Sequence, residues 1–311
     1  MFRVVYKRHR AGLSAEITGA LLWMPRLERQ MAVFVAAADE SDGATQRGPF
    51  LYGGYVAKFT YWTESFTPAW QERVLNGNPV LPYFHMTEVN SPKGREKYGL
   101  EGIEADRRIE EAVNVIRSSG GLYLCTTEMD GGHFRDVFKD FKIPTKGKQP
   151  GVYRFEPDYL AFLGFAFAAL EYVGREHPDA DKVNFVVERK PPITHHLGDF
   201  HDSMTMALEH IGRKNLIRYL GDLLPGEKEQ TPLQAADTAV WHIRKFKAFE
   251  STRTDERRLA FLLHGRTFSQ TGLKRGEMDG LNERAKAQNF PSPFTPKPKR
   301  AIGGASSGEA V

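Results

Sequence analysis

The hydrophobic and polar positions of this chain alternate between strand-like and helix-like patterns from about residue 31 to residue 265. Residues 32–38 form a continuous apolar run, and the polar stretch from Asp39 to Gly43 that follows it is typical of a turn. A second strand is predicted over 50–59, where Gly53 and Gly54 indicate a bulge or close packing. Further strands are predicted over 121–128, 182–187 and 216–220, and helices over 64–75, 103–118, 157–173, 200–211 and 232–246, with more helix to about residue 264.

Strands that come first and then alternate with helices predict an α/β fold, a sheet covered by helices. The pattern also suggests three parts. Residues 1–30 lack a clear period and are interpreted as an N-terminal extension, and residues 31–265 form the α/β domain. Residues 266–311 are basic and rich in Pro and Gly, and we expect a disordered tail because such a segment buries too little apolar surface to offset its ordering entropy.

Composition and charge agree with a globular protein whose excess of positive charge lies at its two ends. The chain has 311 residues, of which 41% are hydrophobic and 26% charged. The net charge of +4 comes from the two ends, since residues 1–30 hold six basic and two acidic side chains and residues 285–311 hold four and one. A basic tail can hold nucleic acid in a salt-dependent way or be an ordinary solvated terminus.

Several features point to a cytoplasmic protein. The single cysteine, Cys125, excludes an internal disulfide and a Cys-rich zinc site. The apolar stretch after the basic first ten residues is short and ends at Pro25, too little for a signal peptide. The longest apolar run, residues 159–170, is about 12 residues long, whereas a membrane span needs about 20. We therefore expect no membrane partner, and the oligomeric state is left open.

Two carboxylates end apolar strands. Asp39 follows the run 32–38, and Glu188 follows the run 183–187. Ligands of α/β sheets collect at the carboxyl ends of the strands. The two acids would lie at the same sheet edge if their strands are parallel neighbours. The alternatives are that Asp39 caps a turn and that Glu188 pairs with the following Arg189 or Lys190.

A third carboxylate, Asp237, lies within the predicted helix 232–246. Thr231 is expected to cap this helix, with Gln234 completing a capping box. Leu233 and Trp241, four residues before and after Asp237, share its helical face, so Asp237 lies on or beside the apolar face. A lone ionised carboxylate there is costly, and a metal ion or a partner is the usual remedy. The alternative is that Asp237 bonds a backbone group as a structural acid.

Three carboxylates at one edge suit Mg²⁺ or Mn²⁺, hard cations that take oxygen ligands. Two such ions about 4 Å apart can clamp the attacking and leaving oxygens of a phosphodiester displacement. We therefore predict that Asp39, Glu188 and Asp237 are metal ligands and catalytic residues, with Glu128 as a rival for the role of Glu188. Residues expected to support the ligands from nearby are Glu40, Ser41, His85, Asp222 and Gln234.

Three segments resemble the domain-of-unknown-function 3800 family. They are Asp39-Glu40-Ser41 after an apolar strand, the segment Gly53–Ala57, and the segment Pro232–Asp237. The resemblance covers about residues 31–250. It implies a ribonuclease H-like mixed sheet flanked by helices, with the acids as metal ligands of a nuclease-like site. The sequence departs from the family at Asp42, where glycine usually follows.

The function predicted from these features is divalent-metal-dependent hydrolysis of phosphodiester bonds, with nucleic acid as the partner. Two alternatives use the same residues. One is a non-catalytic nucleic-acid-binding or phage-defence-associated module with the same fold, in which the acids are structural. The other is a small-nucleotide phosphohydrolase, because DNA, RNA and nucleotides would all need the same metal clamp.

Overall fold

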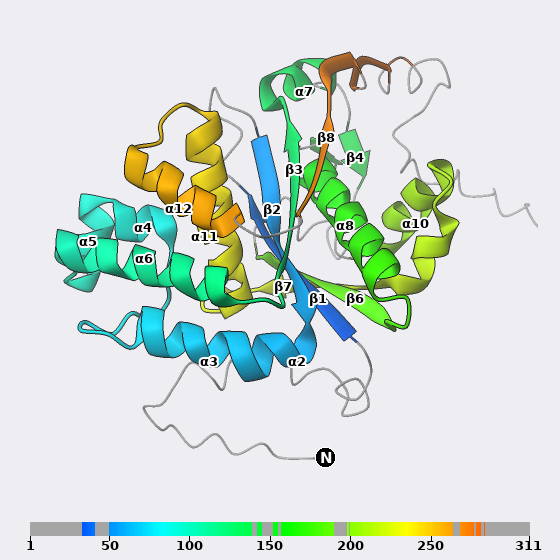
Figure 1. The fold of residues 1–311 in the computed structure, drawn as a ribbon. Helices are drawn as coiled ribbons and strands as arrows, with labels where there is room; N and C mark the ends of the chain where they lie inside the picture. The colour runs from blue at the N-terminus through cyan, green and yellow to red at the C-terminus, as the bar shows by residue number, and fades with distance from the viewer. Residues whose placement is uncertain are drawn as a thin grey trace, which may run out of the picture.

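Six strands form one mixed sheet in the computed structural model (Figure 1). Their order across the sheet is β7-β6-β1-β2-β3-β8, and a separate hairpin is formed by β4 and β5. The strands are β1 (Val33–Glu40), β2 (Phe50–Lys58), β3 (Tyr123–Met129), β4 (Lys142–Pro144), β5 (Val152–Arg154), β6 (Lys182–Glu188), β7 (Leu220–Gly226) and β8 (Phe268–Leu273). The structure describes residues 33–40, 50–138, 142–144, 152–154, 157–189, 198, 200–263, 268–276, 278–280 and 283.

Strand directions place the predicted acids at one edge of the sheet. Strand β2 is antiparallel to both β1 and β3, whereas β6 is parallel to β1, β7 to β6, and β8 to β3. The carboxyl ends of five strands therefore lie at the same edge. Ala38 pairs with Val187, so Asp39 and Glu188 follow side by side on neighbouring strands.

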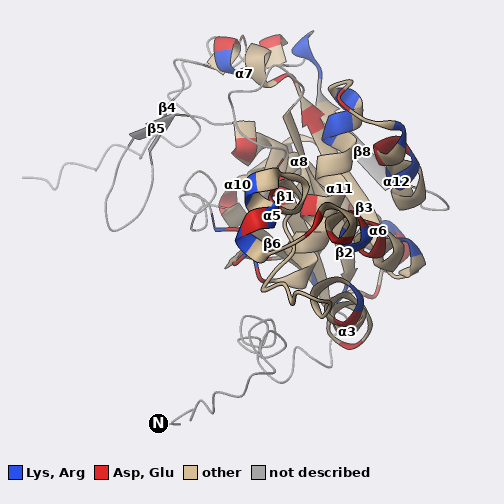
Figure 2. Cartoon of the chain, turned by 90° about the vertical axis from the view of Figure 1, so that its left-hand side faces the viewer, with Lys and Arg blue, Asp and Glu red and all other residues tan. Residues whose placement is uncertain are grey.

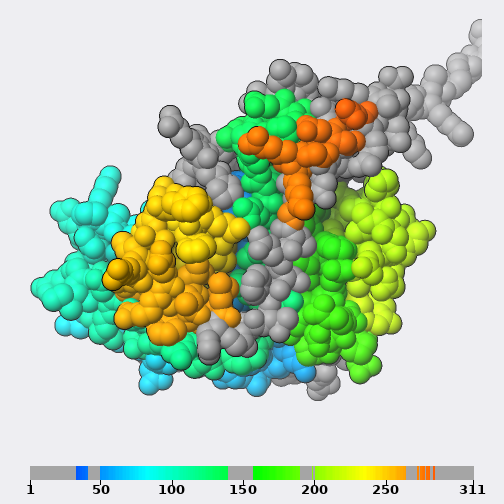
Figure 3. Space-filling view, turned by 45° about the horizontal axis from the view of Figure 1, so that its top comes forward, coloured from blue at the N-terminus to red at the C-terminus, as the bar shows by residue number. Residues whose placement is uncertain are grey.

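Helices cover both faces of the sheet, as the two sides of Figures 1 and 3 show, so the predicted mixed sheet flanked by helices is confirmed. One face packs against helices α11 and α3, and the other against helix α8. The helices around the first face are α2 (Phe59–Tyr61), η2 (Trp62–Phe66), α3 (Thr67–Trp70), η3 (Gln71–Leu75), α4 (Met86–Asn90), α5 (Pro92–Tyr98), α6 (Gly102–Ser118), α11 (Thr231–Lys247) and α12 (Arg253–Leu263). The others are α7 (Gly131–Phe138), α8 (Pro157–Glu176), α10 (Phe200–His210) and η4 (Lys214–Tyr219).

A glycine lets helix α11 approach the sheet closely. Gly54 of β2 lies opposite Ala38, and a β-carbon at Gly54 would lie 1.9 Å from the Ala37 carbonyl oxygen and 2.9 Å from Ala236 Cβ. Only glycine fits this position without moving the helix or the strand. The predicted close packing at Gly54 is confirmed, and it sets the distance between α11 and the edge that carries Asp39.

The strand predicted over 216–220 is wrong. Residues 214–219 form the 3₁₀ helix η4, and strand β7 begins only at Leu220. Leu216 and Tyr219 are both buried, and residues three apart eclipse each other in a 3₁₀ helix, so both can pack against Gly174 of α8. Asp222 therefore lies near the beginning of a strand and not after the end of one, as the predicted strand 216–220 implied.

Two boundaries also differ from the sequence prediction. The helix expected from residue 64 begins at Phe59, directly after β2. The domain end expected at residue 265 is too early, because β8 (Phe268–Leu273) pairs with β3 as an edge strand. The N-terminal extension 1–30 and most of the predicted tail lie outside the described residues.

Basic and acidic residues, blue and red along the ribbon in Figure 2, are interspersed on the helices that cover the first face. Arg257 and Arg258 of α12 both pair with Glu110 of α6, at 2.7 and 3.1 Å. The Arg257–Glu110 pair is exposed, and pairs of that kind contribute about 1 kcal/mol or less. The Arg258 side chain is buried. No helix in the described ranges is long and apolar enough to cross a membrane.

Stability should fall in mild acid because of His242, which is 1% exposed on α11. Burial lowers the pKa of His242 to about 4, below its ordinary 6.5. Between these values the unfolded chain binds the proton that the folded chain excludes, so stability is lost as the pH falls below 6.5. At pH 5 the loss should be roughly 2 kcal/mol relative to pH 7.

Thermal unfolding at pH 7 and pH 5 checks this for the wild type and for His242→Phe, which keeps an aromatic ring beside Trp241. The variant should lose less stability between the two pH values. An equal loss in both proteins would show that His242 is not the group responsible.

Candidate functional site

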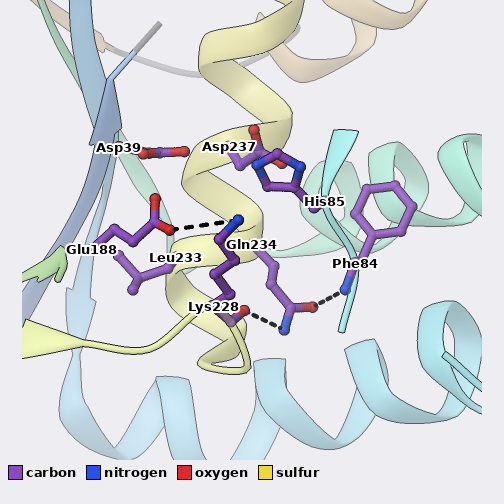
Figure 4. Close-up of a pocket in the computed structure, with 8 residues that line it drawn as sticks. All are labelled: Asp39, Phe84, His85, Glu188, Lys228, Leu233, Gln234 and Asp237. Atoms are coloured by element: carbon purple, nitrogen blue, oxygen red, sulfur yellow. Dashed lines mark hydrogen bonds and ion pairs between the residues drawn. The ribbon is translucent and has the colours of Figure 1, made fainter. Parts of the chain in front are cut away.

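The three predicted acids line one pocket. Asp39 comes from β1, Glu188 from β6 and Asp237 from α11, three elements far apart in the sequence (Figure 4). The pocket holds about 250 Å³, including space open to solvent. Its other lining residues are Phe84, His85, Lys228, Leu233 and Gln234.

The two strand acids are held at the sheet edge with little exposure. Asp39 is 6% exposed, and the Glu188 side chain is 12% exposed. Side chains alternate along a strand, so Asp39 shares the face of Ala37, which packs toward α11. The Asp39 Oδ1 accepts a hydrogen bond from the Glu40 amide at 2.9 Å. Carboxylates this buried are costly unless other groups compensate their charge.

Helix α11 holds the opposite wall of the pocket. Asp237 Oδ2 accepts a hydrogen bond from the Met86 amide at 2.6 Å, and Gln234 Oε1 accepts one from the Phe84 amide at 3.1 Å. The side chains of Phe84 and Met86 are buried in the core, whereas His85 between them lines the pocket. Asp237 therefore both faces the site and fixes the segment that presents His85.

The imidazole of His85 has an unsatisfied atom. Its Nδ1 is buried and has no hydrogen-bond partner among the described residues. Buried polar atoms are nearly always paired with protein, water or a ligand, so each exception calls for an explanation. In a pocket lined by three carboxylates, a bound ligand is one explanation. Sequence analysis expected His85 near the site, and the pocket contains it.

Gln234 supports the pocket by joining three segments. Its Oε1 also accepts a hydrogen bond from Trp70 Nε1 at 2.9 Å, and its Nε2 donates to the carbonyl oxygens of Lys228 and Glu229, both at 3.0 Å. These bonds occupy both acceptor positions of the Gln234 Oε1 and both N–H groups of its Nε2. Gln234 therefore holds the segments that form the pocket walls in place. The predicted capping box is wrong, because Gln230 is the N-cap and its side chain makes no capping hydrogen bond.

Lys228 is a pocket residue that sequence analysis missed. Its Nζ lies 3.8 Å from Glu188 Oε1 (Figure 4), and 42% of its side chain is exposed. It is the only Lys or Arg that lines the pocket in the described part of the chain. Its sequence neighbourhood, Gly226-Glu227-Lys228, reads as a solvated turn, so no local signal marks it.

Two of the predicted supporting acids lie elsewhere. Asp222 lies near the start of β7, at the opposite edge of the sheet, where it pairs with Lys182 at 3.7 Å and its side chain is 71% exposed. The prediction for Asp222 is wrong, because β7 begins later than expected. Strand β1 continues through Glu40, whose side chain therefore faces away from the pocket.

The rival acid Glu128 is also outside the pocket. Glu128 lies near the carboxyl end of β3 and pairs with Lys247, the last residue of α11. Asp237 lies nearer the other end of this helix. Glu188, and not Glu128, shares the pocket with the other two acids. Ser41 lies outside the described residues.

Charges at this edge also act on Tyr52, a buried residue of β2 opposite Glu40. Burial and the negative charges of Glu40 and Asp39 raise the pKa of Tyr52 well above its ordinary value. Its hydroxyl therefore stays protonated at any physiological pH.

The donor atoms of the pocket suit a hard divalent cation. Three carboxylates supply oxygen ligands, and the buried Nδ1 of His85 adds a nitrogen without a hydrogen-bond partner in the described ranges. As the side chains stand, no three His, Cys, Asp or Glu residues of the described chain are grouped so that they could hold one ion. Part of the acid charge is already engaged, by Lys228 and by the Met86 amide. A shared ion would therefore need the carboxylate side chains to rotate toward one another.

No family model, curated protein or solved structure matches the chain. The fold and the site together define an α/β protein with a carboxylate-lined pocket at the carboxyl ends of its parallel strands.

Proposed function

We propose that this protein is a divalent-metal-dependent hydrolase of phosphodiester bonds, a nuclease with a ribonuclease H-like fold. The observation that carries the proposal is the meeting of Asp39, Glu188 and Asp237 in one pocket. Two of these acids end parallel strands and the third lies on the covering helix. Formation of the hydrophobic core does not require them to lie close together.

The central strands support the fold part of the proposal. Strands β1, β2 and β3 form an antiparallel meander, and β6 and β7 add two parallel strands on the other side of β1. A mixed sheet of this kind, flanked by helices, is what the proposed ribonuclease H-like fold requires. The resemblance of residues 31–250 to the domain-of-unknown-function 3800 family is part of the same proposal.

Electrostatics favour a cation between this pocket and a phosphate group. Three carboxylates repel a phosphodiester, since like charges about 4 Å apart cost several kcal/mol where solvent is partly excluded. When bound, Mg²⁺ or Mn²⁺ would supply the charge that attracts the phosphate and would activate a water for attack on phosphorus. Asp39, Glu188 and Asp237 would hold the ions.

The choice between Glu188 and Glu128 as the third metal ligand gives a direct test. Glu188→Gln should reduce Mn²⁺- or Mg²⁺-dependent cleavage of DNA or RNA by at least about 100-fold, because it removes a ligand charge from the pocket. Glu128→Gln removes the same charge from the same sheet edge but outside the pocket, so its activity should stay within about threefold of the wild type. Cleavage rates of the three proteins on single- and double-stranded substrates measure this.

Reversed results, with Glu128→Gln inactive and Glu188→Gln active, would place the site around Glu128. A wild type that is inert with both ions on DNA, RNA and a panel of small nucleotides would refute the proposed hydrolase.

A further inference from the structure

One cation lies among the acids of the pocket. Lys228 belongs to the loop between β7 and α11, and its Nζ approaches Glu188 Oε1 to 3.8 Å. Asp39 and Asp237 line the same pocket. The ammonium group therefore lies beside Glu188, one of the acids proposed to hold the metal ion, in the pocket that the other two also line.

The position of Lys228 is built into the fold. Gln234 Nε2 donates hydrogen bonds to the carbonyl oxygens of Lys228 and Glu229, and Gln234 is itself 1% exposed on α11. The backbone of Lys228 is thereby fixed at the pocket wall. Its side chain is 42% exposed and flexible, so the ammonium can leave Glu188 without a change in the backbone.

We infer that Lys228 is a built-in counter-ion that competes with a divalent cation for this pocket. The inference rests on the proposed metal-dependent function. Without metal, the ammonium compensates part of the charge of the buried carboxylates. A divalent ion beside Glu188 would repel the ammonium and drive it toward solvent. Because such coupling is reciprocal, Lys228 must weaken metal binding by the same factor by which metal weakens the Lys228–Glu188 pair.

Titration calorimetry of the full-length protein with Mn²⁺ tests the competition. Lys228→Met keeps most of the apolar stem and removes the charge, and it should bind Mn²⁺ about tenfold more tightly than the wild type. Lys228→Arg keeps the charge and should stay within about threefold. A matched control is Lys214→Met, which removes the same charge from an exposed pair with Glu209 outside the pocket and should leave the affinity unchanged.

Thermal unfolding without metal gives a second readout. Lys228→Met should unfold at a lower temperature than the wild type, and saturating Mn²⁺ should remove the difference. A loss that persists in Mn²⁺ would overturn the inference, because a general defect of folding would then explain it.

The Mn²⁺ titrations distinguish failure of the Lys228 competition from failure of the proposed metal-dependent function. Mn²⁺ binding that is equal in wild type and Lys228→Met would overturn the competition and leave the hydrolase proposal standing. Absence of binding in both proteins would overturn both.

Discussion

Replacing Asp39 with Asn should reduce metal-dependent phosphodiester cleavage by about 1000-fold, because a neutral amide cannot replace a charged ligand worth several kcal/mol. The side chain keeps its size at a position that is 6% exposed, so the fold should persist. Without metal, the variant should be as stable as the wild type or more stable, since it removes a buried charge beside two other acids. Cleavage rates and thermal unfolding of the same samples measure both effects.

Asp222→Asn is the matched control for this substitution. It makes the same chemical change on an exposed side chain at the opposite edge of the sheet. Its cleavage rate should equal that of the wild type. If Asp39→Asn retains the wild-type rate, or if both variants lose activity to the same degree, the catalytic role of Asp39 is refuted.

Gly54→Val should destabilise the protein by about 3 kcal/mol, the upper part of the range for overpacked cores. Its β-carbon would be forced against the Ala37 carbonyl oxygen, 1.9 Å away, and against Ala236 of α11. Relief requires β2 to shift away from the backbone of β1 and α11 to move away from the sheet, which would displace both Asp39 and Asp237. We therefore expect a melting temperature lower by roughly 6–12 °C and a loss of activity greater than the loss of folded protein.

The neighbouring glycine provides the comparison. A β-carbon at Gly53 would meet Thr126 Cγ2 at 3.0 Å, the Cys125 carbonyl oxygen at 3.1 Å and Val240 Cγ2 at 3.3 Å, all much longer than the 1.9 Å contact at Gly54. Gly53→Ala should therefore cost much less stability than Gly54→Val. Equal losses would mean that the close approach at Gly54 does not position α11.

The sheet edge and its acids could be predicted because local sequence signals mark them. Asp39 and Glu188 each follow a long apolar run, and such runs with a polar end are typical of buried strands. Asp237 was predicted because the helix pattern around it is strong and regular. These features depend on residues that are close together in the sequence.

What could not be predicted depends on contacts between distant segments. Strand β7 contains Gly221, Asp222 and Pro225, a poor strand pattern, and its pairing with β6 supplies the missing stability. Strand β8 was missed for the same reason. Lys228 has no local signal, since its place in the pocket is set by hydrogen bonds from Gln234 to its backbone.

Asp39, Glu188 and Asp237 are proposed to bind one divalent metal centre, and a crystal structure of the protein soaked in Mn²⁺, with anomalous diffraction data, would show it. We expect an anomalous peak within about 2.6 Å of carboxylate oxygens from both Asp39 and Asp237, with Glu188 in the same cluster and Lys228 withdrawn. A pocket without a peak, or Asp39 and Asp237 carboxylates more than about 8 Å apart, would contradict it, because paired ions themselves lie about 4 Å apart.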